Sequence, residues 1–368
     1  MVPNSIFKIF KQTFNKSTQK AAEAAYKEIN KLHKEFTDPD LRDYKSFGRL
    51  IDGAAVEAMQ KIFETQPHFS IEIKGSEGRK DTKRDGIKSP DLYGSYGPGN
   101  GMRVEIVNDA VEGTAFASRN IPGSTSVLAA CLNQKNGLLP TGNFDYMSKL
   151  FGPPQLKNKI SLELSPAENY KIALHELKIK PEDLAVVILD RPRNQFEIDS
   201  AHDLNLTVIL IPGGDLTPSL LATQDLKVFE EIKSKKIPSH IKAMLVIGSG
   251  GWEEGIISAS AAKAAGGHAQ GRIYSEDKEI SEQAKIMDID DLVPAHPDSI
   301  LVSATPITED EWFGAKSINQ TISITHKGLE IMNYPAAELT GYPSESSSVN
   351  HLSFHKAARH SGSRIESD

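Results

Sequence analysis

Leu184-Ala-Val-Val-Ile-Leu189 is an uninterrupted apolar run, which predicts a strand buried on both faces of a sheet. Helix and strand patterns alternate on either side of this run. Further strands are predicted at residues 206–211, 243–247 and 300–304, and helices at residues 166–177, 196–204, 216–223 and 252–265. Alternation of this kind is typical of α/β proteins in which helices cover both faces of the sheet.

The first half of the chain has a different order of predicted elements, because two long helix patterns precede its strands. Residues 14–36 and 47–66 carry apolar side chains at helical spacing. The first 22 residues contain four lysines and no acid, which favours an amphipathic N-terminal helix over a targeting peptide. Strands are predicted at residues 69–74, 102–107 and 124–132, and a loop at residues 90–101.

Composition excludes several classes of protein. The net charge of −7 and the lack of a long basic run argue against a bulk nucleic-acid binder. Cys131 is the only cysteine, so an intramolecular disulfide is impossible and a cysteine-based zinc site is implausible. No apolar run approaches the roughly 20 residues that a membrane span needs. We therefore expect a soluble cytoplasmic protein.

The predicted strands of the second half end in polar sequence. These ends are Asp190-Arg-Pro-Arg193, Pro212-Gly-Gly-Asp215, Gly248 to Gly255, and Thr305. Ligands of open α/β sheets bind at the carboxyl ends of strands, so we expect one shared cleft. Arg191 and Arg193 flank a proline and could both face one anion, although such a sequence is more often a surface turn. Gly248-Ser-Gly-Gly251 precedes a helix pattern and predicts a backbone nest for an anion, with mere packing as the alternative.

A second chemical signal is Val107-Asn-Asp-Ala-Val-Glu-Gly-Thr114, where a predicted strand stops and the chain turns. Asp109 and Glu112 are three residues apart, and two clustered carboxylates suit a hard divalent cation. A polar turn with solvated acids is the alternative. Glu77 and Glu254 also lie in glycine-containing turns at strand ends, and an oxygen-only site of these four acids would suit Mg²⁺ or Mn²⁺. Asp52 is expected near the start of its helix, where the helix dipole alone would favour a carboxylate.

Together these features resemble the class II fructose-1,6-bisphosphatases, which share the lithium-sensitive, metal-dependent phosphatase fold. The similarity runs from about Asp52 to Gly314. The motifs that carry it are Asp52-Gly-Ala-Ala-Val56, Glu77-Gly78 with Asp81, Asp109-x-x-Glu-Gly-Thr114, Tyr146-Met-x-Lys149, Leu189-x-Arg-Pro-Arg193, Gly214-Asp215, Gly250-Gly-x-x-Glu-Gly255 and Ser303-Ala-Thr-x-Ile-Thr308.

The resemblance implies a role for each matching residue. The residues that correspond to the family's metal ligands are Asp52, Glu77, Asp109, Glu112 and Glu254. Thr114 with Asp52 matches the pair that orients the attacking water, and Asp81 matches an acid near the metal site that we count among the catalytic residues. Gly113 and Thr114 match the cradle of the scissile phosphate. The sugar-phosphate pocket corresponds to Tyr146, Arg191, Arg193 and Asp215.

The chain also departs from the family pattern. Gly48 stands where the family has a lysine, Arg79 where an acid is usual, and Gly213 where the family has an aspartate. Ala110 and Glu253 each replace a proline. The candidate metal ligands are thus retained, whereas positions around them and in the sugar pocket are changed.

We therefore expect a two-lobed, layered α/β sandwich with its active site between the lobes. The expected parts are an N-terminal helical segment (1–36), a metal-binding α+β lobe (37–165), an α/β lobe with the sugar-phosphate pocket (166–341) and a disordered tail (342–368). The expected activity is Mg²⁺- or Mn²⁺-dependent hydrolysis of fructose 1,6-bisphosphate by a homo-oligomer. The alternatives are a phosphatase for sedoheptulose 1,7-bisphosphate or an inositol phosphate, and a non-catalytic phosphosugar-binding relative.

Overall fold

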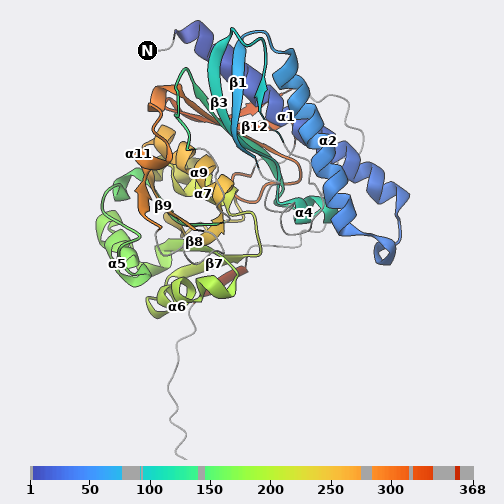
Figure 1. The fold of residues 1–368 in the computed structure, drawn as a ribbon. Coiled ribbons are helices and arrows are strands. Elements are labelled where there is room, and N and C mark those ends of the chain that lie inside the picture. Colours follow the sequence, from blue (N-terminus) through green and yellow to red (C-terminus); the bar gives the residue numbers. More distant parts are fainter. Residues whose placement is uncertain are drawn as a thin grey trace, which may run out of the picture.

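The frame of the molecule is a pair of seven-stranded sheets (Figure 1). The computed structural model describes residues 3–76, 92, 94–139, 146–274, 284–314 and 318–334, and the backbone of 353–356. In spatial order the first sheet contains β13 (Gly328–Asn333), β12 (Gln320–Thr325), β11 (Ile300–Pro306), β4 (Thr125–Leu132), β3 (Met102–Glu112), β1 (Phe69–Ser76) and β2 (Ser95–Tyr96). The second contains β10 (Ile286–Asp288), β9 (His268–Tyr274), β5 (Tyr146–Gly152), β8 (Ala243–Gly251), β6 (Leu184–Leu189), β7 (Thr207–Ile211) and β14 (Ser353–Lys356).

Helices separate and cover the sheets, as Figure 1 shows. The helices are α1 (Asn4–Glu35), α2 (Tyr44–Thr65), α4 (Thr114–Arg119), α5 (Pro166–Leu177), α6 (Gln195–Asp203), α7 (Leu216–Ala222), α8 (Leu226–Ile232), α9 (Trp252–Ala265) and α11 (Ile289–Leu292). Short 3-10 turns lie at Pro39–Leu41, Pro154–Leu156, Pro181–Asp183, Pro192–Asn194 and Pro297–Ser299. Because α9 contacts β3, β4 and β11 of the first sheet and β5, β8 and β9 of the second, it fills the space between them. The layering confirms the predicted α/β sandwich.

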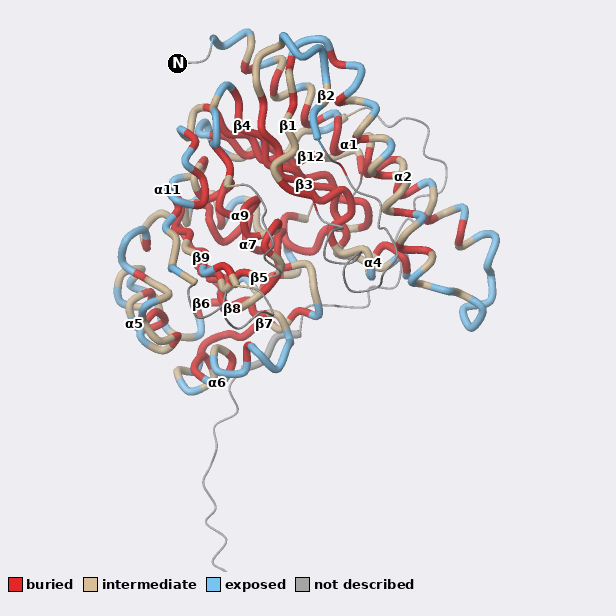
Figure 2. Tube along the Cα trace, in the orientation of Figure 1, coloured by how far each residue is buried: buried red, intermediate tan, exposed pale blue. Residues whose placement is uncertain are grey.

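Three apolar cores hold these layers together, and most of the central strands are buried (Figure 2). Outside the first sheet, Phe10 and Phe14 of α1 pack with Phe63 of α2 and Phe69 of β1. The core between the sheets is centred on α9, whose Trp252 is fully buried. Helices α5 and α6 cover the outer face of the second sheet. Burial of a continuous apolar face on each layer is the main stabilising contribution of such a fold.

Neither sheet is one continuous segment of the chain. The chain leaves the first sheet after β4, enters the second at β5 and returns to the first at β11. The division into lobes at residues 37–165 and 166–341 stays a prediction. Within the predicted tail, the backbone of Ser353–Lys356 pairs antiparallel with β7, and the rest of that tail lies outside the described residues.

Several element boundaries differ from the predicted ones. Helix α1 starts at Asn4 rather than at residue 14, because Phe7 and Phe10 continue its buried stripe toward the N-terminus. Strand β3 does not stop at Val107 but continues to Glu112, so the expected turn comes five residues later. The sequence did not predict strands β2, β5, β9, β10, β12 and β13 or helices α4, α8 and α11, and β2 lies within the loop predicted at residues 90–101. Among the described residues, no helix has the length and apolar character to span a membrane.

Candidate active site

A cleft of about 530 Å³ opens between the end of β3 and the strand ends of the second sheet. Its wall includes eight of the expected site residues: Asp52, Glu112, Gly113, Thr114, Arg191, Arg193, Asp215 and Glu254. Lys45, Arg49 and Arg119 line it as well, so basic groups stand on both of its sides. We call the residues from α2, β3 and α4 the first-sheet side, and those from the second sheet and α9 the second-sheet side.

Thr114 and Asp52 form the hydrogen-bonded pair that the sequence predicted. Thr114 Oγ1 donates to Asp52 Oδ1 over 3.1 Å and lies 2.9 Å from the carbonyl oxygen of Val111. The two acceptors share the single hydroxyl proton, so the threonine oxygen keeps lone pairs for a further donor.

The expectation that Asp52 lies near the start of its helix was wrong. Helix α2 begins at Tyr44 and is capped by Asp43, which places Asp52 well beyond the first turn, where the dipole has little effect.

A local irregularity at the end of β3 sets the positions of the Asp109 and Glu112 carboxylates. Pairing with β4 shifts register between Asp109 and Glu112, as in a β-bulge. Both carboxylates are buried, and Asp109 Oδ1 accepts the backbone N–H of Val111 at 2.9 Å. Gly113 then adopts φ = 76°, a left-handed conformation that lets the chain turn directly into α4. Glu112 and Thr114 therefore reach the cleft from opposite ends of one tight turn.

Gly48 stands beneath this turn, and its lack of a side chain is needed there. A Cβ atom at this position would lie 2.8 Å from Thr114 Cγ2. Such a contact is too short for two carbon atoms, so a side chain at residue 48 would displace the threonine. The departure from the family lysine at Gly48 is thus coupled to the position that Thr114 takes.

On the second-sheet side, the arginines are held by backbone oxygens. Arg191 donates to the carbonyls of Asp190 and Pro212, and Arg193 Nε donates to the carbonyl of Ser249 over 3.2 Å. Both side chains are exposed at the cleft. The guanidinium carbon of Arg193 also lies 5.0 Å from the ring centre of Tyr146, which brings this last expected pocket residue to the edge of the cleft.

Asn194 is a supporting residue that the sequence analysis did not identify. It is fully buried, accepts the N–H of Ser249 at 2.8 Å and donates to the carbonyl of Leu189 at 2.9 Å. These bonds tie the arginine turn to the end of β8. An asparagine two residues after an Arg-Pro pair has many uses in surface turns, so its type alone gave no signal.

The predicted anion-binding nest at residues 248–251 was wrong. The structure extends β8 through Gly251, and Gly248 to Gly251 pair with Lys149 to Tyr146 of β5. Their small size instead makes room for carboxylates. The Glu254 carboxylate folds back over Gly251, where a Cβ atom would lie 1.9 Å from its Oε2.

Lys149 is the second residue whose importance the sequence did not reveal, although it belongs to a quoted motif. Its side chain is 1% exposed, and its Nζ lies 2.7 Å from Asp215 Oδ2. Burial alone lowers the pKa of Lys149, but the carboxylates of Asp215, Glu254 and Glu112 outweigh burial and raise the pKa above its ordinary value. A charged ammonium therefore lies directly behind the cleft.

The carboxylates at the cleft are chemically suited to bind a divalent cation. Glu254 Oε2 is buried without a hydrogen-bond partner in the described part of the chain, and carboxylate oxygens are the ligands that hard cations prefer. Within the described ranges, however, no three His, Cys, Asp or Glu side chains are placed to hold a metal ion by themselves. Glu77 and Asp81, which the sequence assigned to the site, lie outside those ranges together with Arg79.

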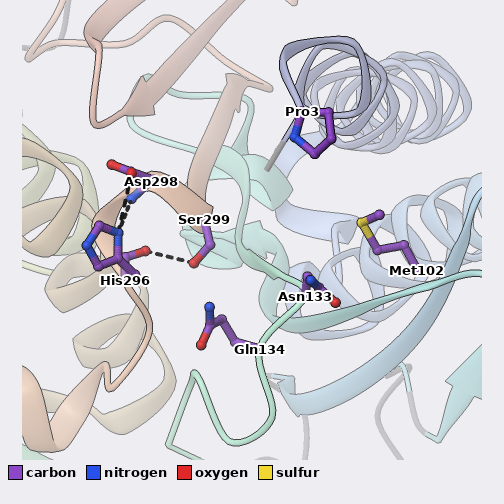
Figure 3. A pocket seen from close by; sticks show the side chains of 7 residues that line it. All are labelled: Pro3, Met102, Asn133, Gln134, His296, Asp298 and Ser299. Carbon is purple, nitrogen blue, oxygen red and sulfur yellow. Dashed lines mark hydrogen bonds and ion pairs between the residues drawn. The ribbon is translucent and has the colours of Figure 1, made fainter. Parts of the chain in front are cut away.

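A second cavity, of about 510 Å³, lies at the opposite end of β3 (Figure 3). Its walls are formed by Pro3, Met102, Asn133, Gln134, His296, Asp298 and Ser299. None of the expected site residues that the structure describes lines this cavity, whereas eight of them line the first cleft.

Comparisons with known proteins identify the family of this chain. The family model described as bacterial fructose-1,6-bisphosphatase, glpX-encoded, matches residues 47–327. The chain is 30% identical over 276 residues to the D-fructose 1,6-bisphosphatase class 2/sedoheptulose 1,7-bisphosphatase of Crocosphaera subtropica, which covers 70% of this chain and 75% of that protein. Proteins of the same name from Prochlorococcus marinus and Thermosynechococcus vestitus are 33% and 32% identical over 60% and 61% of this chain, and the matches cover 60% and 62% of those proteins. The chain belongs to the class II fructose-1,6-bisphosphatase family.

Proposed function

We propose that this chain hydrolyses the 1-phosphate of fructose 1,6-bisphosphate, giving fructose 6-phosphate and phosphate, with Mg²⁺ or Mn²⁺ as cofactor. Its family makes it a phosphoric monoester hydrolase, and that family is metal-dependent. The observation that carries the proposal is the 3.1 Å bond from Thr114 to Asp52 in a cleft that also contains carboxylates and two arginines. These are the groups that a metal-assisted attack of water on a bisphosphate requires.

The first-sheet side would perform the chemistry. Its Asp52 and Glu112, together with Asp109 and Glu77 and with Glu254 of the second-sheet side, would hold the cation, which would neutralise phosphate charge and lower the pKa of a water. Asp52 accepts the Thr114 proton, so the threonine oxygen accepts a hydrogen bond from the attacking water and orients it. Gly113 leaves the backbone accessible to the scissile phosphate.

The second-sheet side would bind the rest of the substrate. Arg191 and Arg193 would hold the phosphate that is not cleaved, because a guanidinium presents several N–H donors to one anion. Tyr146 and Asp215 would contact the sugar. Remote binding of this kind places the reacting phosphorus near the water and lowers the entropic cost of reaction.

Sedoheptulose 1,7-bisphosphate is the second candidate substrate. It appears in the names of the relatives, and Gly213 leaves the sugar side of the cleft without a side chain at one position. A larger sugar would use this space. We also propose a cytoplasmic homo-oligomer without affinity for nucleic acid, in keeping with the net charge of −7.

A phosphate-release assay over a panel of substrates tests the proposal. The panel contains both bisphosphates, an inositol phosphate and a small generic phosphate ester, each with and without Mn²⁺. The expected result is Mn²⁺-dependent release that is fastest from fructose 1,6-bisphosphate. No release from any substrate, together with a raised melting temperature on adding phosphosugars, would favour the non-catalytic binding protein.

A further inference from the structure

Three glycines of the second-sheet side mark a place where four charged side chains meet. A Cβ atom on Gly250 would lie 2.7 Å from both Asp215 Oδ2 and Lys149 Nζ, and one on Gly251 would meet the Glu254 carboxylate. A Cβ atom on Gly214, next to Asp215, would lie 4.0 Å from Glu112 Oε1. The missing side chains leave room for three carboxylates and one ammonium in a single cluster.

Lys149 lies beneath this cluster rather than in the cleft. It is not one of the cleft-lining residues, and it is among the largest fully buried side chains of the described chain. The backbone of β5 fixes its position, because Lys149 pairs with Gly248 of β8. A buried lysine keeps its charge only when carboxylates compensate it; here Asp215 is in direct contact at 2.7 Å, and Glu254 and Glu112 act on it electrostatically.

The charge of Lys149 reduces the repulsion between the neighbouring carboxylates. Carboxylates gathered for a divalent cation repel one another whenever the cation is absent, and burial makes that repulsion stronger. Loss or exchange of the cation leaves the carboxylates with this repulsion. A fixed ammonium behind the carboxylates offsets part of it without occupying the cleft.

We propose that Lys149 is a positioning residue whose buried ammonium keeps the carboxylates of Asp215, Glu112 and Glu254 together while no cation is bound. The inference rests on the proposed function, since it assumes that Glu112 and Glu254 hold a cation. Its consequence follows from linkage: a residue that stabilises the cation-free state more than the loaded state lowers the affinity for the cation. Removing the ammonium should therefore tighten cation binding and make the fold depend on the cation.

The test compares Lys149→Met with the wild type and with Lys242→Met. Lys242 forms an ion pair of the same length, 2.7 Å to Asp183 Oδ2, but its partner lies outside the cleft. Calorimetric titration with Mn²⁺ and thermal unfolding with and without Mn²⁺ require no substrate. For Lys149→Met we expect an Mn²⁺ dissociation constant about tenfold lower than that of the wild type, the low end of the effect of one neighbouring charge. We also expect a larger gain in melting temperature on adding Mn²⁺ than either other protein shows.

The outcomes separate the possible explanations. Equal losses of melting temperature with and without Mn²⁺, at an unchanged dissociation constant, would overturn the inference and leave an ordinary structural ion pair. A Lys149→Met protein that folds only with Mn²⁺ supports the inference. If it folds in neither condition, the measurement passes to Lys149→Gln, and wild-type affinity in that variant overturns the inference. Absence of Mn²⁺ binding by the wild type would instead overturn the proposed function.

Discussion

The two sides of the cleft hold their functional groups in different ways. On the first-sheet side, Thr114 is hydrogen-bonded to the side chain of Asp52 and leaves no space for a side chain at Gly48, and Glu112 is buried. On the second-sheet side, Arg191 and Arg193 are exposed and donate to backbone carbonyls of the turns that carry them. One side is fixed by packing, while the other leaves its donors facing solvent.

From this difference we expect the two sides to have different roles. Groups that orient a reacting water must be held within a fraction of an ångström, which packing on two sides provides. Groups that capture an anion need correct charge and approximate direction, and they adjust as the ligand arrives. Substitutions on the first-sheet side should therefore affect turnover, and those on the second-sheet side should affect binding.

Removal of divalent cations should have the largest effect, because the proposed cation would bind carboxylates of both sides. We expect an excess of chelator to reduce phosphate release to background, and Mg²⁺ or Mn²⁺ to restore it. The reason is that the carboxylates at the cleft would otherwise repel the phosphate. Full activity in excess chelator would rule out the cation as a participant.

Thr114→Val tests the first-sheet side directly. Valine keeps the shape of threonine and removes only the hydroxyl, so turnover should fall by about 10²–10⁴-fold, the range for loss of acid–base assistance. Steady-state kinetics should show this loss in kcat, while Mn²⁺ binding and melting temperature stay close to wild type. Thr207→Val, which removes a hydroxyl bonded to the carbonyl of Glu182, is the matched control. Wild-type turnover in Thr114→Val would mean that another group orients the water.

Arg191→Ala tests the second-sheet side. A hydrogen bond to a charged group contributes about 1.5–3 kcal/mol, which corresponds to roughly tenfold to 150-fold in affinity. We expect a loss of this size in kcat/KM for fructose 1,6-bisphosphate and little change for a small generic phosphate ester. Arg42→Ala is the control, since Arg42 also donates to backbone carbonyls, those of Phe36 and Thr37. Equal losses on both substrates would place Arg191 with the reacting groups.

The sequence predicted the central strands of the second sheet better than it predicted the residues that support the site. The apolar runs of β6, β7 and β8 are buried on both faces and were therefore visible as strands. Strand β9 (His268–Tyr274) contains His, Gln, Gly and Arg, and only its pairing with β5 and β10 makes it a strand.

The candidate site shows the same limit. The motifs around Thr114 and Arg191 predicted residues that line the cleft, because the strand ends that carry them converge. Other features depend on partners that are distant in sequence. These are the burial of Lys149, the hydrogen bonds of Asn194 and the lack of space between Gly48 and Thr114. No local pattern encodes such contacts.

Gly48→Ala sharpens the comparison, because it adds one methyl group behind the first-sheet side. Alanine is more favourable than glycine in a helix by up to about 1 kcal/mol, so α2 itself should not be weakened. The new Cβ atom would lie 2.8 Å from Thr114 Cγ2 and should push the threonine away from Asp52. We expect kcat to fall by about tenfold while the melting temperature is maintained. Wild-type kcat would show that this side is less rigid than the contacts indicate.

Gly213→Asp makes the opposite test on the second-sheet side and should have the smallest effect. A Cβ atom at Gly213 would lie 3.8 Å from the ring of Phe116, an ordinary contact, so the side chain should fit without a change in melting temperature. The carboxylate would offer a sugar hydroxyl one more acceptor, and a net hydrogen bond of about 0.5–1.5 kcal/mol corresponds to roughly twofold to tenfold. We expect kcat/KM for fructose 1,6-bisphosphate to rise by this factor, and that for a small generic ester to stay unchanged. A fall for the bisphosphate alone would mean that residue 213 faces a phosphate rather than a hydroxyl, because the added charge would then repel the substrate. The anion would in that case extend from the arginines to the Pro212–Asp215 turn, and Asp215 would have to be reassigned from sugar binding to holding Lys149 in place.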